Sequence, residues 1–133
     1  MNVLVDTSVW SLALRRSNTD KSKESNLLKE LILDSRVMMM GPIRQELLSG
    51  IAKTSHFNKL KNHLKAFPDL ELTTNDFELA AEYYNNCRSK GIQGSNTDFL
   101  ICSVSVNQKF SIFTVDNDFI LFKEHLPIKL YAS

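Results

Sequence analysis

The sequence predicts an α/β domain with a mainly parallel central sheet and helices on both faces of that sheet. Short apolar runs, typical of buried strands, alternate along the chain with amphipathic stretches of helical spacing. Strands separated by helices need crossover connections, and such connections pair strands in parallel. The 133 residues, of which 43% are hydrophobic and 23% charged, fit one domain over residues 1–133 with a core of its own.

The first expected strand is followed by two expected helices. Residues 2–5 form an apolar run that a polar Asp-Thr-Ser turn ends, which suits a buried strand. Residues 8–14 then place apolar side chains on one helical face. Residues 15–22 are polar and predict a loop, and residues 24–33 carry leucine and isoleucine at helical spacing.

The second expected strand also leads into two helices. Residues 37–40 are apolar and are ended by a Gly-Pro pair. Pro42 suits the first turn of a helix that continues to Leu48, because a backbone N–H has no partner at that position in any case. Residues 55–65 carry a further apolar stripe that predicts a helix, and Pro68 breaks it.

The second half of the chain repeats the alternation. Residues 70–72 predict a short strand. A helix should follow from residue 74 to about residue 90, with Asn75 and Glu78 placed as in a capping box. Gly91 is suited to end that helix.

The last expected elements are one helix and two strands. Residues 97–106 resume helical character, and residues 111–115 form a clear apolar run before an Asp-Asn-Asp turn. Residues 128–131 predict a final strand. With these elements in place, ligands are expected beyond the carboxyl ends of the strands.

Four carboxylates fall at that edge of the predicted sheet. Asp6 ends the first strand, and Asp116 directly follows the strand at residues 111–115. Glu46 lies early in the helix after the second strand, and Asp98 lies near the start of the helix before the third. Each alone is explained by a turn, a helix cap or a solvated surface. Gathered together they would repel one another without a cation between them, and carboxylate oxygens suit Mg²⁺ or Mn²⁺.

The segments around these acids resemble the four motifs of PIN domains, especially those of VapC toxins from toxin–antitoxin pairs. They read LVDTSVW at residues 4–10, PIRQELLSG at 42–50, NTDFLI at 96–101 and FTVDNDF at 113–119. The resemblance covers nearly the whole chain in family order. It implies a PIN-like three-layer α/β/α sandwich.

The resemblance also implies a function and a site. It predicts an Mg²⁺- or Mn²⁺-dependent endoribonuclease, the toxin of a VapBC-type pair that inhibits translation, forms a homodimer and is held inactive by a cognate antitoxin. The matching residues are the catalytic and metal-binding acids Asp6, Glu46, Asp98 and Asp116, a possible additional metal ligand at Asp118, and supporting hydroxyls at Thr7, Ser8 and Thr114. The carboxylates would bind one or two ions, which activate water and offset charge on the phosphate.

Basic residues near the motifs are candidate contacts to the RNA backbone. Arg15 and Arg16 follow the first motif, and Lys59 and Lys61 lie in a second basic stretch. Arg44 neighbours Glu46 and is expected to contact either phosphate or another carboxylate. For any single lysine, a solvated helix face is the competing explanation.

Other function classes fit the sequence less well. A haloacid dehalogenase-type phosphotransferase needs a second aspartate where Ser8 stands, and the acidic pair of a receiver domain and a Walker-type loop are both missing. The remaining alternative is a catalytically silent PIN-like module that binds RNA or protein. All four acidic positions are filled, which favours the enzyme.

The cysteine content and hydropathy suggest a cytoplasmic protein with reduced thiols. Cys87 and Cys102 have no Cys/His partner set that would form a zinc site. Cys102 stands where the family often has a small residue, so we expect it to be buried. No secretory signal and no apolar run long enough for a membrane span are evident.

Overall fold

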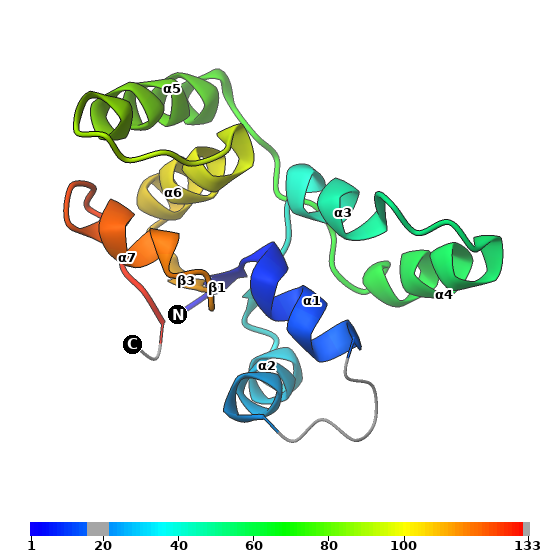
Figure 1. Cartoon of the computed structure of the whole chain (residues 1–133). Helices are drawn as coiled ribbons and strands as arrows, with labels where there is room; N and C mark the ends of the chain where they lie inside the picture. The colour runs from blue at the N-terminus through cyan, green and yellow to red at the C-terminus, as the bar shows by residue number, and fades with distance from the viewer. Residues whose placement is uncertain (16–21, 132–133) are drawn as a thin grey trace.

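Three short strands alternate with seven helices in the computed structural model, which describes residues 1–15 and 22–131 (Figure 1). None of the described helices combines the length and the apolar composition needed to cross a membrane. The elements are β1 (Val3–Val5), α1 (Thr7–Arg15), α2 (Lys23–Leu33), β2 (Val37–Met38), α3 (Gly41–Leu48), α4 (Thr54–Leu64), α5 (Thr74–Ser89), α6 (Asn96–Gln108), β3 (Ser111–Phe113) and α7 (Asp118–Lys123).

The strands form one parallel sheet in the order β2-β1-β3. Val3 pairs with Val37 on one side of β1, and Val5 pairs with Phe113 on the other. From β1 the chain first leads to β2 on one side of that strand, and it later returns to place β3 on the other side. The helices α1 and α2 lie on one face of the sheet, and α6 and α7 lie on the opposite face (Figure 1). The predicted three-layer α/β/α sandwich with a parallel sheet is confirmed. Its switch in winding direction lies between β1 and β3, where open α/β sheets place their ligand sites.

The core is continuous through the sheet and the helix α6. All residues of β1 and β3 are buried, which explains why their sequences are apolar without alternation. In α6, seven consecutive residues from Phe99 to Ser105 are buried, because α5 packs along one side of the helix and β3 lies near another. Cys102 lies in this buried run, as expected, and Cys87 is buried on α5. The strands β1 and β3 and the helix α6 are thus the most deeply buried elements of the fold.

Capping boxes start the two longest helices. In α5, the Thr73 side chain accepts a hydrogen bond from the Asp76 N–H, and the Asp76 carboxylate accepts one from the Thr73 N–H. The expected pairing of Asn75 with Glu78 is wrong, because the helix begins one residue before Asn75 and the box shifts accordingly. Asp76 is buried and also accepts a hydrogen bond from Asn107 of α6 at 2.7 Å. The cap of α5 therefore joins the two helices.

Two expected strands and one unexpected helix are the differences from the sequence prediction. Residues 70–72 are not a strand, and only an isolated bridge from Met39 to Asp69 forms beside them. Residues 128–131 likewise contribute a single bridge, between Ile112 and Leu130. Both segments still pack against the core, so their apolar patterns signalled burial rather than strand pairing. The helix α7 was not expected, because it has only six residues.

The loop before α6 approaches two aromatic rings closely at Gly94. A Cβ atom at this position would lie 2.7 Å from Cζ of Phe122 and 2.9 Å from Cε2 of Phe99. The two rings themselves are 4.8 Å apart between centroids. Glycine is therefore required here by close packing, which holds α7 against α6.

Candidate active site

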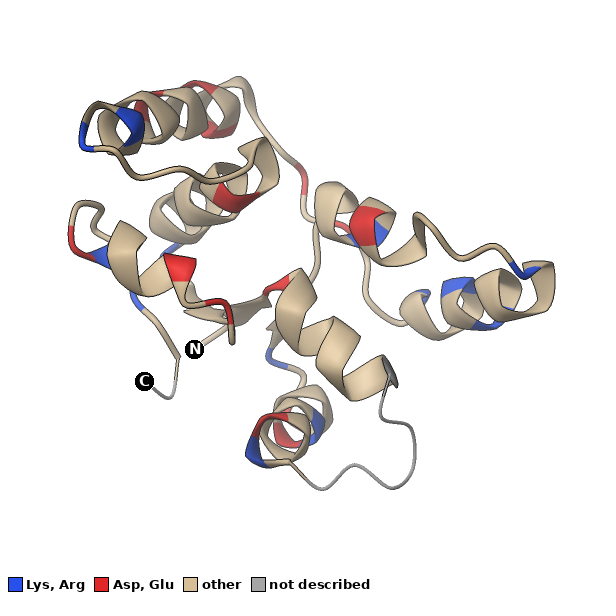
Figure 2. Cartoon of the chain, viewed as in Figure 1, with Lys and Arg blue, Asp and Glu red and all other residues tan. Residues whose placement is uncertain are grey.

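A pocket of about 610 Å³ opens at the carboxyl ends of β1 and β3. The four acids singled out in the sequence all line it, and they come from four separate segments of the chain. Figure 2 shows acidic ribbon at the start of α1, on α3, on α6 and before α7. The lining, which we call the acidic pocket, consists of Asp6, Thr7, Ser8, Pro42, Gln45, Glu46, Ser49, Thr97, Asp98 and Asp116.

Asp6 is the buried centre of the acidic pocket, with an exposed fraction of 4%. Its N–H donates to the Phe113 carbonyl at 2.8 Å, which continues the parallel pairing of β1 with β3. Its Oδ2 atom accepts hydrogen bonds from the Ser8 hydroxyl at 2.6 Å and the Thr114 hydroxyl at 2.9 Å. One carboxylate oxygen is thus fixed by residues that are 106 positions apart along the chain.

The same two hydroxyls fix the segment that carries Asp116. The Ser8 Oγ accepts a hydrogen bond from the Val115 N–H at 3.1 Å, and the Thr114 Oγ1 accepts one from the Asp116 N–H at 3.0 Å. Oδ1 of Asp116 in turn accepts the N–H of Asp118 at 2.9 Å. Ser8 and Thr114 therefore position two acids at once.

The other two acids are each held by a single neighbouring group. The Thr7 hydroxyl donates to Oε1 of Glu46 at 2.8 Å and so links α1 to α3. Oδ2 of Asp98 accepts the Ser95 N–H at 3.0 Å in the capping box of α6. At the N-terminus of a helix, this carboxylate also lies at the positive end of the helix dipole.

Each of the four carboxylates has one engaged oxygen and one without a described hydrogen-bond donor. The engaged atoms are Oδ2 of Asp6, Oε1 of Glu46, Oδ2 of Asp98 and Oδ1 of Asp116. No cationic side chain within residues 1–15 and 22–131 pairs with any of them, since the ion pair found there joins Arg44 to Asp69. The acidic pocket is consequently rich in negative charge and in available oxygen atoms.

The pKa of Asp98 is shifted by its burial and by the neighbouring acids. Its pKa is raised above the ordinary value, mainly because burial disfavours the charged form. The negative charges of Asp6 and Asp116 raise the pKa further, whereas the hydrogen bonds from Ser95 act in the opposite direction. The shift therefore reflects both the burial of Asp98 and its position near Asp6 and Asp116.

The donor chemistry of the acidic pocket fits a hard divalent cation. Four carboxylates with free oxygens and no opposing cation are the ligand type that Mg²⁺ and Mn²⁺ prefer, with waters completing the coordination shell. In the described part of the chain, however, no three His, Cys, Asp or Glu side chains lie close enough together to enclose an ion. A bound ion would therefore need the side chains to move inward or to be contacted through water.

The structure separates Asp118 from the other predicted acids and adds polar neighbours. Asp118 does not line the acidic pocket, and its backbone N–H rather than its carboxylate supports Asp116. Gln45, Ser49 and Thr97 line the pocket but were not singled out in the sequence. Gln45 and Thr97 directly precede Glu46 and Asp98, and Ser49 caps the end of α3, but no local pattern separates these three residues from ordinary surface residues.

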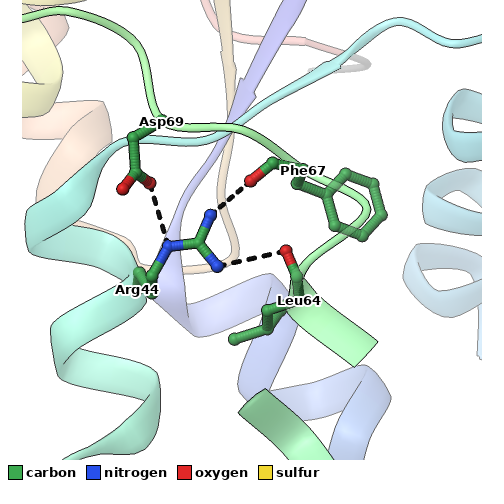
Figure 3. Close-up of polar contacts among 4 residues, drawn as sticks. All are labelled: Arg44, Leu64, Phe67 and Asp69. Carbon is green, nitrogen blue, oxygen red and sulfur yellow. Dashed lines mark hydrogen bonds and ion pairs between the residues drawn. The ribbon is translucent and has the colours of Figure 1, made fainter. Parts of the chain in front are cut away.

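Arg44 takes the second of its two expected roles, contact with a carboxylate. Its guanidinium donates to Asp69 at 3.0 Å, to the Leu64 carbonyl at 3.1 Å and to the Phe67 carbonyl (Figure 3). These contacts fasten the end of α4 and the following loop to α3. These contacts give Arg44 a structural role, and contact between Arg44 and RNA stays a prediction.

The remaining basic candidates do not line the acidic pocket. Lys59 and Lys61 are exposed on α4, where Figure 2 shows a concentration of basic ribbon. Arg15 is the last residue of α1, and Arg16 falls outside the described residues. Contact with RNA at these positions stays a prediction.

Comparison with known proteins identifies a family and similar folds. The PIN domain family matches residues 3–124. The fold is similar to that of FitAcB from Neisseria gonorrhoeae, with a TM-score of 0.76, 18% identity, and coverage of 97% of this chain and 96% of that one. It is also similar to VapBC2 from Rickettsia felis bound to a promoter DNA fragment, with a TM-score of 0.74, 18% identity and coverage of 98% and 97%.

A further similar structure is VapBC-5 from Mycobacterium tuberculosis, described as a member of the VapBC family of toxin–antitoxin systems. Its TM-score is 0.70 at 15% identity, with coverage of 98% of both chains. No curated protein sequence matches the chain significantly. At these identities the solved structures establish the fold, and the functional argument has to come from the site.

Proposed function

This chain belongs to the PIN-domain family, and from that premise we propose that it is a metal-dependent endoribonuclease and the toxin of a VapBC-type toxin–antitoxin pair. PIN domains are generally nucleases. One observation carries the proposal for this chain: Asp6, Glu46, Asp98 and Asp116 line one pocket, and each keeps one carboxylate oxygen without a described donor. A silent binding module would have no use for four unneutralised carboxylates in one pocket.

The residues of the acidic pocket have different roles in the proposed hydrolysis of the phosphodiester bond. Mg²⁺ or Mn²⁺, when bound, lowers the pKa of a coordinated water and offsets the charge that develops on the phosphate. The hydroxyls of Ser8 and Thr114 keep Asp6 from turning away, and Thr7 does the same for Glu46. The attacking water would pass its proton to Asp98 or Asp116.

RNA is proposed as the substrate, held in part by basic residues outside the acidic pocket. A phosphate backbone is repelled by carboxylates, so binding needs both the cation in the pocket and positive charge nearby. Lys59 and Lys61 are exposed and unpaired among the described residues, which leaves them available for such contacts. Arg15 and Arg16 are proposed on sequence position alone.

A cognate antitoxin and a second copy of the chain are the proposed protein partners. The antitoxin is supported by fold similarity to complexes named as VapBC, one of them from a toxin–antitoxin family. The homodimer rests on family resemblance. We place the activity in the cytoplasm, where RNA and ribosomes are found and buried thiols such as Cys87 and Cys102 remain reduced.

The proposal is tested by metal-dependent cleavage of a labelled single-stranded RNA. The wild-type protein should cleave with Mn²⁺ or Mg²⁺ and lose activity in excess chelator. Asp6→Asn and Asp98→Asn should each lose activity, because each removes a negative oxygen that faces the ion. Glu30→Gln, an exposed acid-to-amide change on α2, is the matched control and should cleave normally.

Binding of the ion is measured separately by thermal denaturation. Mn²⁺ should raise the melting temperature of the wild type and of Glu30→Gln, but raise it less in Asp98→Asn, since a ligand stabilises the state that binds it. Cleavage that persists in chelator, or full activity in both pocket variants, would reject the nuclease. RNA binding without cleavage in any metal would support the silent module instead.

A further inference from the structure

A second groove of about 510 Å³ lies next to the acidic pocket. The two hollows adjoin at Pro42, Gln45 and Thr97, which line both. The residues that line the groove come from α3, α5 and the start of α6, which are labelled in Figure 1. We call it the amide groove; its other lining residues are Phe77, Ala80, Ala81, Tyr84, Asn85, Asn96 and Leu100.

The chemistry of the amide groove is opposite to that of the acidic pocket. None of its lining side chains carries a charge, so the groove offers nothing to pair with a phosphate or an ion. Gln45, Asn85 and Asn96 are exposed and supply amides, each with a donor and an acceptor side by side. Asparagine and glutamine amides pair in this way with the edges of nucleobases.

An aromatic side chain stands at the amide groove without a covering partner in the described structure. Phe77 is 54% exposed, although it is a large apolar residue on the long helix α5. Two turns further along the same helix, Tyr84 is held in place, because its hydroxyl accepts a hydrogen bond from Arg88 at 3.1 Å and its ring packs edge-on against Phe99. An exposed ring beside amides suits a base that stacks on one face and is hydrogen-bonded at its edge.

We propose that the amide groove binds one unpaired nucleobase of the RNA, next to the phosphate that is cleaved. The inference rests on the proposed function, because a base would lie in the groove only if an RNA phosphate is bound at the neighbouring acids. Gln45 and Thr97 adjoin Glu46 and Asp98 in sequence, so a nucleotide with its phosphate at the acids has its base at the groove. A base enters only if it is not paired, so the groove would read one unpaired nucleotide through its amides.

The test compares cleavage-site profiles on a single-stranded RNA pool of randomised sequence. Phe77→Ala should raise KM about tenfold, the effect of losing one stacked base, with kcat nearly unchanged. It should also flatten the nucleotide preference at one position beside the cut. Asn85→Ala should change the preference at the same position, whereas Phe77→Tyr should retain the wild-type profile. Ile120→Ala on α7 is the matched control, since Ile120 is 55% exposed.

A binding measurement separates failure of the groove from failure of the nuclease. Fluorescence anisotropy of a labelled single-stranded oligonucleotide is measured for the same variants with Ca²⁺ in place of Mg²⁺ or Mn²⁺, and the oligonucleotide is verified to be intact. Weaker binding by Phe77→Ala with no cleavage by any protein would keep the base site and reject the nuclease. Cleavage with an unchanged profile and unchanged affinity in Phe77→Ala would overturn the base site alone. A change of molar mass in Phe77→Ala, with the profile intact, would overturn it in favour of contact with a second copy of the chain.

Discussion

At the scale of single residues, the negative charge of Asp98 in the acidic pocket lowers the stability of the metal-free fold. Burial and the acidic neighbours Asp6 and Asp116 favour the protonated form of Asp98 and raise its pKa. Its folded-state pKa therefore lies above the unfolded value, so the folded protein loses stability as pH rises through that interval. A bound cation would reverse this penalty.

Asp98→Asn should therefore raise the melting temperature of the metal-free protein at neutral pH, by a few degrees. The amide oxygen can still accept the Ser95 N–H, so the helix cap is preserved. The gain should shrink as the pH falls through the folded-state pKa of Asp98, because the carboxyl of the wild type then becomes protonated as well. Thermal denaturation in chelator across this pH range provides the measurement. A variant that melts below the wild type at neutral pH would contradict the electrostatic explanation.

A second prediction at this scale separates the two aspartates after β3. Asp118→Asn should retain cleavage within about twofold, because the Asp118 contribution to the site is its backbone N–H. Asp116→Asn should lose well over tenfold, the loss that follows when a group that orients or holds a metal is removed. Single-turnover rates for the two variants decide the matter. Equal losses of cleavage rate in the two variants would instead support Asp118 as a metal ligand.

The residues at the acidic pocket were predictable to the extent that they are encoded locally. An acid after an apolar run lies at the carboxyl edge of the sheet whatever the rest of the chain does, so Asp6 and Asp116 were found from the strands alone. The polar lining at Gln45, Ser49 and Thr97 was not found, since nothing in their own sequence context distinguishes them from surface residues. The role of Arg44 depended on Asp69, a partner 25 positions away that no local pattern specifies.

At the scale of elements, close packing between α6 and α7 depends on a glycine. Gly94→Ala should lower the free energy of unfolding by about 1–3 kcal/mol, since the new methyl group would overlap the rings of Phe99 and Phe122. Gly41→Ala is the matched control, because a Cβ atom there meets nothing within 4 Å. Urea denaturation of both variants measures the difference. Equal stabilities would mean that the rings move aside without cost.

The elements that the sequence did not predict correctly are the shortest ones. An apolar run is a signal of burial, and residues 70–72 and 128–131 are indeed packed against the core. Whether such a run pairs into a strand depends on the partner, and β2 has only two residues to offer. The helix α7 has six residues, fewer than two turns, and its apolar pattern is too short to separate from a loop.

At the scale of the whole molecule, charge is divided between regions rather than balanced within them. The formal net charge is +1, yet the acidic pocket holds four carboxylates without a described counterion, and α4 carries exposed lysines. Such a division suits a polyanion that must approach an acidic site.

Reversing the charges at Lys59 and Lys61 should weaken RNA binding and reduce its dependence on salt. If both lysines contact phosphates of a single strand, the slope of log affinity against log salt concentration should fall by about 1.4. A double reversal at Lys109 and Lys129, which are exposed beside β3 rather than on α4, is the control and should leave the slope nearly unchanged. Binding titrations at several salt concentrations give the slopes. An unchanged slope in the α4 variant would remove this helix from the RNA path.

The hydroxyls of Ser8 and Thr114 both donate to Oδ2 of Asp6, and this has a consequence for synthesis of the protein. While the ribosome is still translating the first hundred or so residues, Asp6 has only half of its support, and the acids of α6 and of the turn after β3 have not yet emerged. A nascent chain therefore lacks the complete set of acids and the second hydroxyl that positions Asp6. The acidic pocket can form only when translation of the polypeptide is almost finished.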